Sequence, residues 1–363
     1  MKLFLITLAL STCVFAQTTQ VSTPQYVAID SHDNLFVGLQ YGIIRISPDG
    51  SLTNLTKSSL ELDRKWSNLI VDSKDNLYAN DGKLIYKFKF DRSGKFDGAV
   101  FAGQKWTYDL VDGPLAKAGF NTIGLMAIDR DDNIYVTDSF DKIKNTVGTN
   151  FVTDNFDLSV QAQTIKRKNR KSYSVIRRIS PNGIVSTLKT PDGKFILVNQ
   201  ISGMATDAKG DIIFGSYSFG RFVGKIDVNT GAISLIAGQA YKREYCPVYT
   251  QGPIATAEFV EPENIIVNRN GEIVVADQRI NRLIKIANGR VSTIAGGNII
   301  DPCSQNIAGR SQEGYKDGPA RTALFNFPKG MAFDSKGNLY IADMYNHSIR
   351  KLSSAGVVTT FAK

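Results

Sequence analysis

Apolar and polar residues alternate along this chain in short units, and one unit recurs six times. In each copy an apolar triplet ends in Asp or Asn, a polar turn follows, and a second apolar run begins at a constant spacing. The first copy runs from Ala28-Ile29-Asp30 to Asn34-Leu35-Phe36-Val37, and the others begin at Ile70, Ala127, Ala205, Ile266 and Ala332. An Asx side chain can bond the backbone of a tight turn, and Gly or Asn supplies positive φ within it. The pattern predicts six β-hairpins whose Asp and Asn residues are turn residues and not metal ligands.

Two further apolar runs follow each hairpin. The third run contains a basic residue, as in Ile43-Ile44-Arg45-Ile46 and Ile349-Arg350-Lys351-Leu352, and a fourth run, such as Val291 to Gly297, closes the unit. A four-stranded sheet cannot bury both of its faces alone, so repeated sheets of this kind pack on one another around an axis. We therefore expect an all-β fold, a six-bladed β-propeller of four-stranded antiparallel blades that forms one domain over residues 17–363. The expected blades are 24–56, 66–104, 112–190, 200–239, 251–297 and 316–363, with an insertion at 139–172 in blade three.

Three of the connections share nearly the same letters. They read DGPLAKAGF from Asp112 to Phe120, QGPIATAEF from Gln251 to Phe259 and DGPARTALF from Asp317 to Phe325. The last repeat continues from Phe327-Pro328-Lys329-Gly330 through the final hairpin to Ile349-Arg350-Lys351. In these segments the chain resembles the NHL-repeat propellers, and the resemblance covers essentially all of it after the N-terminal segment. It implies the propeller fold but says little about function, because propellers host many activities.

The N-terminal segment has the features of a secretory signal. A basic start is followed by an apolar run from Leu3 to Phe15 and by Ala16, a small residue, before Gln17. This arrangement predicts a signal peptide over residues 1–16 that is removed after Ala16. An alternative is a lipoprotein acylated at Cys13, although Thr12 is a poor residue for the preceding position. The apolar run is too short to span a bilayer, so we expect a secreted, extracellular protein without a membrane span.

Export changes the interpretation of the cysteines. Only Cys246 and Cys303 remain after the signal, and two cysteines in an exported chain predict one disulfide. Two separate buried thiols are the alternative. Asn54 and Asn346 stand in sequons that would accept glycan in a eukaryotic secretory pathway.

The positive charge is concentrated in one stretch. The net charge is +9, and no acid occurs between Leu158 and Pro191, where eight Lys and Arg residues lie. The densest cluster consists of Lys166, Arg167, Lys168, Arg170 and Lys171. Such a cluster acts on anions within about a Debye length of 8–10 Å. We expect it to contact an acidic glycan or an acidic protein surface, and not nucleic acid, in an exported protein. The alternative is a solvated loop.

The long connections are expected to lie on one face. In propellers the connections between blades, and those between the second and third strands of a blade, emerge on the same side. Here these are residues 139–172, 239–251 and 298–316, and we call this side the loop-bearing face. Long connections on a rigid scaffold commonly carry function. We therefore predict a monomeric binding platform for an extracellular protein or a glycan, without a cofactor.

Catalysis is the alternative function. The chain has two histidines, too few for the metal sites of peptidyl-hydroxyglycine lyases. Gluconolactonase-like and paraoxonase-like propellers instead hold a divalent ion through carboxylate and amide oxygens, which suit Ca²⁺ or Mg²⁺. The candidate ligands for a hydrolase or lyase of that type are Glu261, Glu263, Asn264 and Asn121. The alternative is that Glu261 and Glu263 are surface charges on either side of Pro262.

Overall fold

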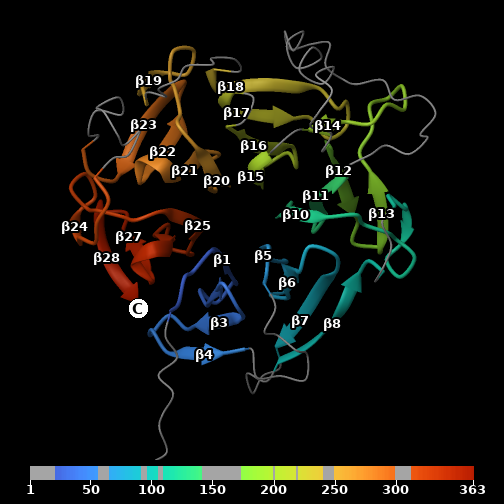
Figure 1. Cartoon of the computed structure of the whole chain (residues 1–363), viewed down its shortest axis with the longest axis horizontal. Helices are drawn as coiled ribbons and strands as arrows, with labels where there is room; N and C mark the ends of the chain where they lie inside the picture. Colours follow the sequence, from blue (N-terminus) through green and yellow to red (C-terminus); the bar gives the residue numbers. More distant parts are fainter. Residues whose placement is uncertain are drawn as a thin grey trace, which may run out of the picture.

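Six antiparallel sheets form a ring around a central axis in the computed structural model (Figure 1). The structure describes residues 21–55, 65–90, 96–104, 109–140, 173–198, 201–217, 220–239, 249–298 and 312–363. Within these ranges the only helices are two short 3-10 turns, η1 (Gln278–Ile280) and η2 (Met344–Asn346). None of the described helices is long and apolar enough to cross a membrane. The expected all-β, six-bladed propeller is therefore confirmed.

The first three blades contain the following strands. Blade one has β1 (Tyr26–Ile29), β2 (Leu35–Gly38), β3 (Ile43–Ile46) and β4 (Leu52–Asn54). Blade two has β5 (Asn68–Val71), β6 (Leu77–Asn80), β7 (Ile85–Phe90) and β8 (Phe96–Ala102). Blade three has β9 (Gly113–Pro114), β10 (Ile123–Ile128), β11 (Ile134–Phe140), β12 (Tyr173–Ile179), β13 (Ile184–Thr187) and β14 (Leu197–Val198).

The last three blades repeat the arrangement. Blade four has β15 (Ile201–Thr206), β16 (Ile212–Ser216), β17 (Arg221–Ile226) and β18 (Ile233–Gln239). Blade five has β19 (Gly252–Pro253), β20 (Pro262–Val267), β21 (Ile273–Asp277), β22 (Arg282–Ala287) and β23 (Arg290–Ala295). Blade six has β24 (Gly318–Pro319), β25 (Pro328–Phe333), β26 (Leu339–Asp343), β27 (Ser348–Leu352) and β28 (Val357–Ala362).

The Gly-Pro connections add a strand that the sequence did not predict. Each of these short strands precedes the innermost strand of its blade along the chain but pairs with the outermost strand. β9 pairs with β13, β19 with β23 and β24 with β28. The Phe at the end of each connection, namely Phe120, Phe259 and Phe325, is fully buried. The shared letters of these connections thus encode an edge strand followed by an aromatic side chain that enters the core.

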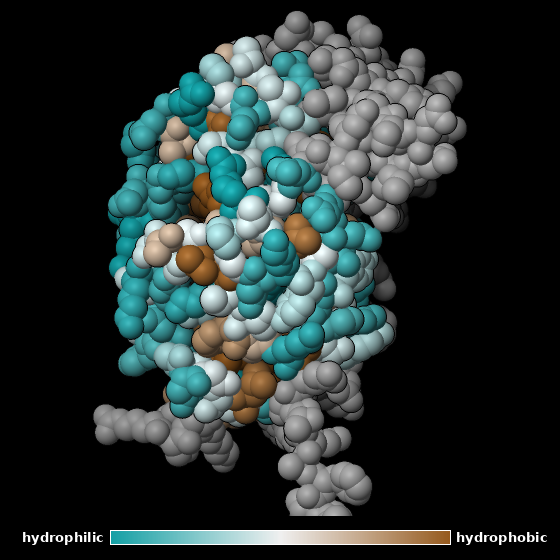
Figure 2. All heavy atoms as spheres, turned by 90° about the vertical axis from the view of Figure 1, so that its left-hand side faces the viewer, coloured by the Kyte–Doolittle hydropathy of each residue, from teal (hydrophilic) through white to brown (hydrophobic). Residues whose placement is uncertain are grey.

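The apolar core lies between neighbouring blades. One cluster joins Phe36 of blade one to Trp66, Leu77 and Phe88 of blade two, and similar clusters fill the spaces between the other blades. The outer surface carries mainly hydrophilic residues, with apolar ones in separate spots, in the side view of blades five and six (Figure 2). The blades therefore bury their faces against each other, as the repeat pattern predicted.

The repeated Asp and Asn residues are turn residues, as predicted. Asp30 Oδ1 accepts the backbone N–H groups of His32 (3.0 Å) and Asn34 (2.8 Å), and its Oδ2 accepts the Asn34 side-chain amide at 2.7 Å. Asp72, Asp129 and Asp334 make the same contacts with Asn76, Asn133 and Asn338.

The same turns join neighbouring blades, which the sequence analysis missed. Positive φ was expected of Gly or Asn, but Asp33 adopts it at 62°. Asp33 accepts both the backbone N–H and the hydroxyl of Ser335 from blade six, each at 2.7 Å. Equivalent Ser–Asp pairs join blade one to two and blade two to three. One of the three pairs therefore closes the ring.

Candidate functional site

The starts of the innermost strands and the turns between the second and third strands lie on the same face of the ring. The Tyr345 N–H, in the turn between β26 and β27, donates to the carbonyl of Asn326 just before β25, at 3.1 Å. The Gln278 N–H, after β21, donates to the Glu261 carbonyl just before β20, at 3.3 Å. The connections between blades reach the innermost strands here, so this is the loop-bearing face. The Asx turns lie at the opposite ends of the strands.

Three described turns of the loop-bearing face expose tyrosines. Tyr41, between β2 and β3, is 63% exposed, Tyr345, between β26 and β27, is 52% exposed, and Tyr217, after β16, is 37% exposed. The Tyr345 ring also packs against Phe327, with ring centroids 4.9 Å apart. Large exposed aromatic side chains are typical of contact surfaces.

Two buried arginines hold the connections of this face in place. Arg350 is fully buried, and its Nη1 donates to Asp343 Oδ2 at 2.7 Å while its Nη2 donates to Asp317 Oδ1 at 2.5 Å. The same guanidinium also donates to the carbonyls of Leu324 (3.0 Å) and Lys316 (2.9 Å). In blade three Arg177 makes the corresponding contacts with Asp138, Asp112, Gly119 O and Val111 O. The basic residue of the third apolar run is thus a structural clamp in these two blades.

Blade five lacks this clamp. In blade six Arg350 of β27 pairs with Ile341 of β26. At the equivalent position of blade five, Ile284 of β22 pairs with Val275 of β21. Gln251 stands where the other connections have Asp112 and Asp317. Asp277 is fully buried and accepts the backbone N–H groups of Val260 and Glu261, each at 2.8 Å. Burial, together with the negative charge of Glu261, raises the pKa of Asp277 to about 7, although these two hydrogen bonds and the positive charge of Arg221 oppose the shift.

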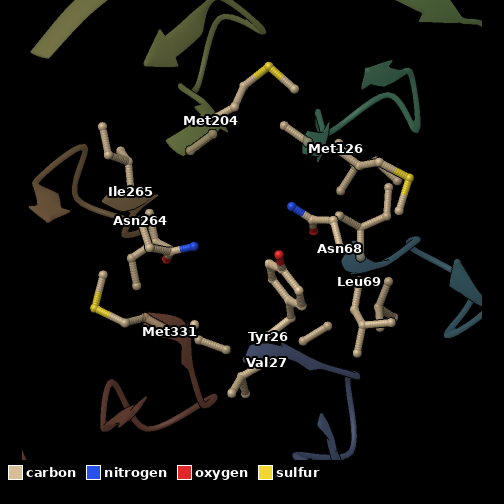
Figure 3. Close-up of a pocket in the computed structure, with 18 of the residues that line it drawn as sticks. Tyr26, Val27, Asn68, Leu69, Met126, Met204, Asn264, Ile265 and Met331 are labelled. Atoms are coloured by element: carbon tan, nitrogen blue, oxygen red, sulfur yellow. The ribbon is translucent and has the colours of Figure 1, made fainter. Parts of the chain in front are cut away.

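The six innermost strands surround a cavity of about 360 Å³. Tyr26 from β1, Asn68 from β5 and Asn264 from β20 point into it, and the two amides face each other from opposite sides (Figure 3). We call these three side chains the channel girdle. Met126, Met204 and Met331 also border the cavity, but their side chains are buried between blades.

Tyr26 and Asn68 were not among the site residues expected from the sequence. The signal was present in the repeat, because all three girdle residues stand four positions before the turn Asp or Asn, at Asp30, Asp72 and Asn268. An alignment of the six hairpins at this position, and not a search for catalytic motifs, would have found them.

A half-buried acid, Glu263, and a half-buried base, Lys329, lie near the start of the innermost strands. Burial raises the pKa of Glu263. The positive charge of Lys329 and a hydrogen bond with Tyr217 oppose this shift, and the negative charge of Glu261 adds to it. Burial lowers the pKa of Lys329, which Glu263 partly offsets. The Lys329 ammonium lies 5.1 Å from the centroid of the Tyr26 ring and donates to Gln25 Oε1 at 3.3 Å. Burial, with the negative charge of Glu263, raises the pKa of Tyr26 to about 12, so the phenol is neutral at physiological pH.

The structure separates the candidate metal ligands. Asn264 belongs to the channel girdle, but the Asn121 amide donates to the Ser139 carbonyl at 2.5 Å, at the edge of blade three. Glu261 lies near Arg279 and Arg221, and Glu263 lies near Lys329, so each glutamate has a cation beside it. Among the described residues, no three His, Cys, Asp or Glu side chains are arranged to hold a metal ion. Of the four candidate ligands, Asn264 alone lines the central cavity.

Several predicted residues lie outside the described part of the chain. These are Lys166, Arg167, Lys168, Arg170, Lys171, Cys246 and Cys303. β11 extends to Phe140 and pairs with Tyr173 of β12, so the ends of the expected insertion meet in the sheet. Of the two sequon asparagines, Asn54 is exposed at the end of β4, whereas the Asn346 amide donates to Gly314 O and Asp343 Oδ2, each at 2.8 Å. A glycan on Asn346 would replace one of the two hydrogens of this amide and so remove at least one of the two bonds.

Sequence comparisons match part of the chain. A family model described as Teneurin NHL domain matches residues 222–353. The chloroplastic protein SUPPRESSOR OF QUENCHING 1 of Arabidopsis thaliana is 43% identical over 47 residues, which is 13% of this chain and 4% of that protein.

Solved structures share the architecture at low identity. A protein of unknown function from Bacteroides thetaiotaomicron has a TM-score of 0.62 at 17% identity, over 92% of this chain and 70% of that one. An auxiliary nutrient binding protein from Bacteroides ovatus has a TM-score of 0.57 at 15% identity, over 94% and 70%. A gluconolactonase from Xanthomonas campestris has a TM-score of 0.53 at 12% identity, over 94% and 87%. At these identities the likeness shows the fold alone.

Proposed function

The chain is an NHL-repeat β-propeller, and from this premise we propose that it is a secreted binding platform for an extracellular protein or an acidic glycan. The observation that carries the proposal is the difference between the two faces. The described turns of the loop-bearing face expose Tyr41, Tyr217 and Tyr345. On the opposite face, the Asx turns use their polar side chains in hydrogen bonds within and between blades.

Exposed tyrosines suit a contact surface for a physical reason. A tyrosine offers a large apolar ring with few rotatable bonds and a hydroxyl that can bond a partner. The Tyr345 turn is held by backbone bonds to Asn326 and Phe327 just before β25, and the Tyr41 turn is closed by a bond from the Leu39 N–H to the Gly42 carbonyl, so little order is lost in these two turns on binding.

The basic cluster Lys166–Lys171 supports a glycan as the partner. It lies between β11 and β12, in the connection between the second and third strands of blade three. Lysine and arginine side chains can meet sulfate or carboxylate groups without a preformed pocket, and such contacts weaken as salt is added.

A metal-dependent hydrolase or lyase is the competing function. The structural neighbours include a nutrient-binding protein and a gluconolactonase, so the fold is compatible with both uses. The cations beside Glu261 and Glu263 disfavour a divalent ion at that position, because like charges repel strongly in a partly buried site. We therefore favour the platform.

Retention on immobilised heparin tests the proposal. One variant replaces the basic cluster with glutamine, a second carries Tyr41→Ser, Tyr217→Ser and Tyr345→Ser, and a control carries Leu235→Ser and Val357→Ser on the outer strands. We expect both face variants to elute at lower salt than the parent and the control to elute with the parent. Equal elution of all four proteins, or no retention of the parent, would contradict glycan binding by this face.

A further inference from the structure

The central channel has the features of a binding site separate from the loop-bearing face. We propose that the channel girdle binds a small uncharged polyhydroxyl molecule of about monosaccharide size. This inference goes beyond the proposed platform, since it uses none of the exposed tyrosines or the basic cluster.

The cavity has the size and wall of a small-molecule site. Its volume of about 360 Å³ lies within the range of roughly 300–1,000 Å³ found for ligand pockets. Each innermost strand is the end strand of its sheet, so the edges of six strands border the channel. Backbone N–H and C=O groups on such edges are further donors and acceptors for a ligand.

Glycines shape the wall between the girdle residues. A Cβ on Gly203 would lie 2.3 Å from the Glu263 carbonyl oxygen, and a Cβ on Gly330 would lie 2.6 Å from the Tyr26 Cα. Blades four and six therefore approach their neighbours closely and place no side chain at these positions. The polar side chains at this level come from blades one, two and five (Figure 3).

The girdle has hydrogen-bonding capacity that the protein does not use. Asn264 Oδ1 is buried and has no hydrogen-bond partner among the described residues. Neither the Tyr26 hydroxyl nor the Asn68 amide bonds another described protein atom, whereas the Gly330 N–H on β25 donates to the Gln25 carbonyl at 2.9 Å. The Tyr26 hydroxyl and the Asn68 amide face the cavity, so a molecule that enters the channel can bond them in place of water.

The chemistry of the girdle selects an uncharged polyhydroxyl. Each carboxamide offers a donor and an acceptor side by side, as neighbouring hydroxyl groups of a sugar or cyclitol do, and the phenol adds one of each. The girdle contains no charged side chain. Glu263 and Lys329, near the starts of their strands, have opposite charges, so together they do not favour an ion of either sign.

Ligand-observed saturation-transfer NMR tests this assignment. The probes are glucose, galactose and myo-inositol, with gluconate and alanine as charged comparisons. The proteins are the parent, Asn264→Ala, Asn68→Ala and a control, Asn270→Ala, which makes the same change on an exposed turn at the opposite end of blade five. The Asn264 and Asn68 side chains bond no described protein atom, so both variants should fold, and thermal melting checks this.

We expect the parent to bind at least one neutral probe, and each girdle variant to bind it about fivefold or more weakly, which corresponds to one lost hydrogen bond. The control should match the parent. The tyrosine variant of the loop-bearing face should also match it, which separates failure of this site from failure of the platform. The assignment is overturned if no neutral probe binds, if girdle variants bind as the parent does, or if gluconate or alanine is preferred.

Discussion

Replacing Arg350 with isoleucine should give blade six the arrangement that blade five already has. In blade five Ile284 occupies the ladder position of Arg350, and the pKa of the buried Asp277 is about 7. In blade six Arg350 holds Asp343, Asp317 and two carbonyls. Arg350→Ile removes four hydrogen bonds and leaves Asp343 buried without a cation.

The size of the effect should depend on pH. Removing one partner of a buried ion pair costs about 3–5 kcal/mol when the other partner stays charged, so we expect a loss of that size at pH 8. Burial already raises the pKa of Asp343 in the parent, although its bonds to Asn346, Asn326 and Arg350 oppose this, and without Arg350 the pKa should rise further, towards the value of Asp277. The folded variant then holds a proton between about pH 4 and pH 7 that the unfolded chain has released, so its stability relative to the parent falls as pH rises through this window. Two pH units below a pKa of about 7 correspond to about 2.7 kcal/mol, so the loss at pH 5 should be only about 1–2 kcal/mol.

Urea unfolding at pH 5 and pH 8, followed by tryptophan fluorescence, measures both values, because Trp66 is fully buried. The control is Lys351→Ile, which removes a positive charge from the next residue of β27, where the side chain is partly exposed. We expect its effect to be under about 1 kcal/mol at both pH values. An equal loss for Arg350→Ile at pH 5 and pH 8 would refute the idea that the guanidinium keeps Asp343 ionised.

Three further predictions concern ring closure, blade contact and covalent structure. Asp33→Ala should remove two charge-assisted bonds between blades six and one and lower the unfolding free energy by about 2–3 kcal/mol, and an unchanged urea midpoint would contradict a role in closure. Gly203→Ala should lower the melting temperature markedly, because its Cβ would meet the Glu263 carbonyl at 2.3 Å, and a parent-like melt would show that the blades can separate at no cost. Non-reducing peptide mapping should find Cys246 linked to Cys303, and two free thiols would end that prediction.

The sequence by itself determined the blade architecture because each repeat is specified by local rules. An Asp such as Asp30 bonds residues two and four positions later, so its turn forms wherever the letters occur. The alternation of apolar residues required sheets that pack on each other. The letters of the Gly-Pro connections carried the resemblance to NHL-repeat propellers, although their role as edge strands was visible only in β9, β19 and β24.

The tertiary structure alone decided which side chains meet. Tyr26, Asn68 and Asn264 come from three different blades, and only closure of the ring turns their equivalent repeat positions into one girdle. Burial is likewise a property of the assembled blades. Arg350 and Arg45 both stand in third apolar runs, but Arg45 has the ladder position of Lys351, and of the two arginines only Arg350 meets two carboxylates. A repeat pattern fixes the local turn and strand, whereas the partner of each side chain depends on residues from other blades that the local sequence does not contain.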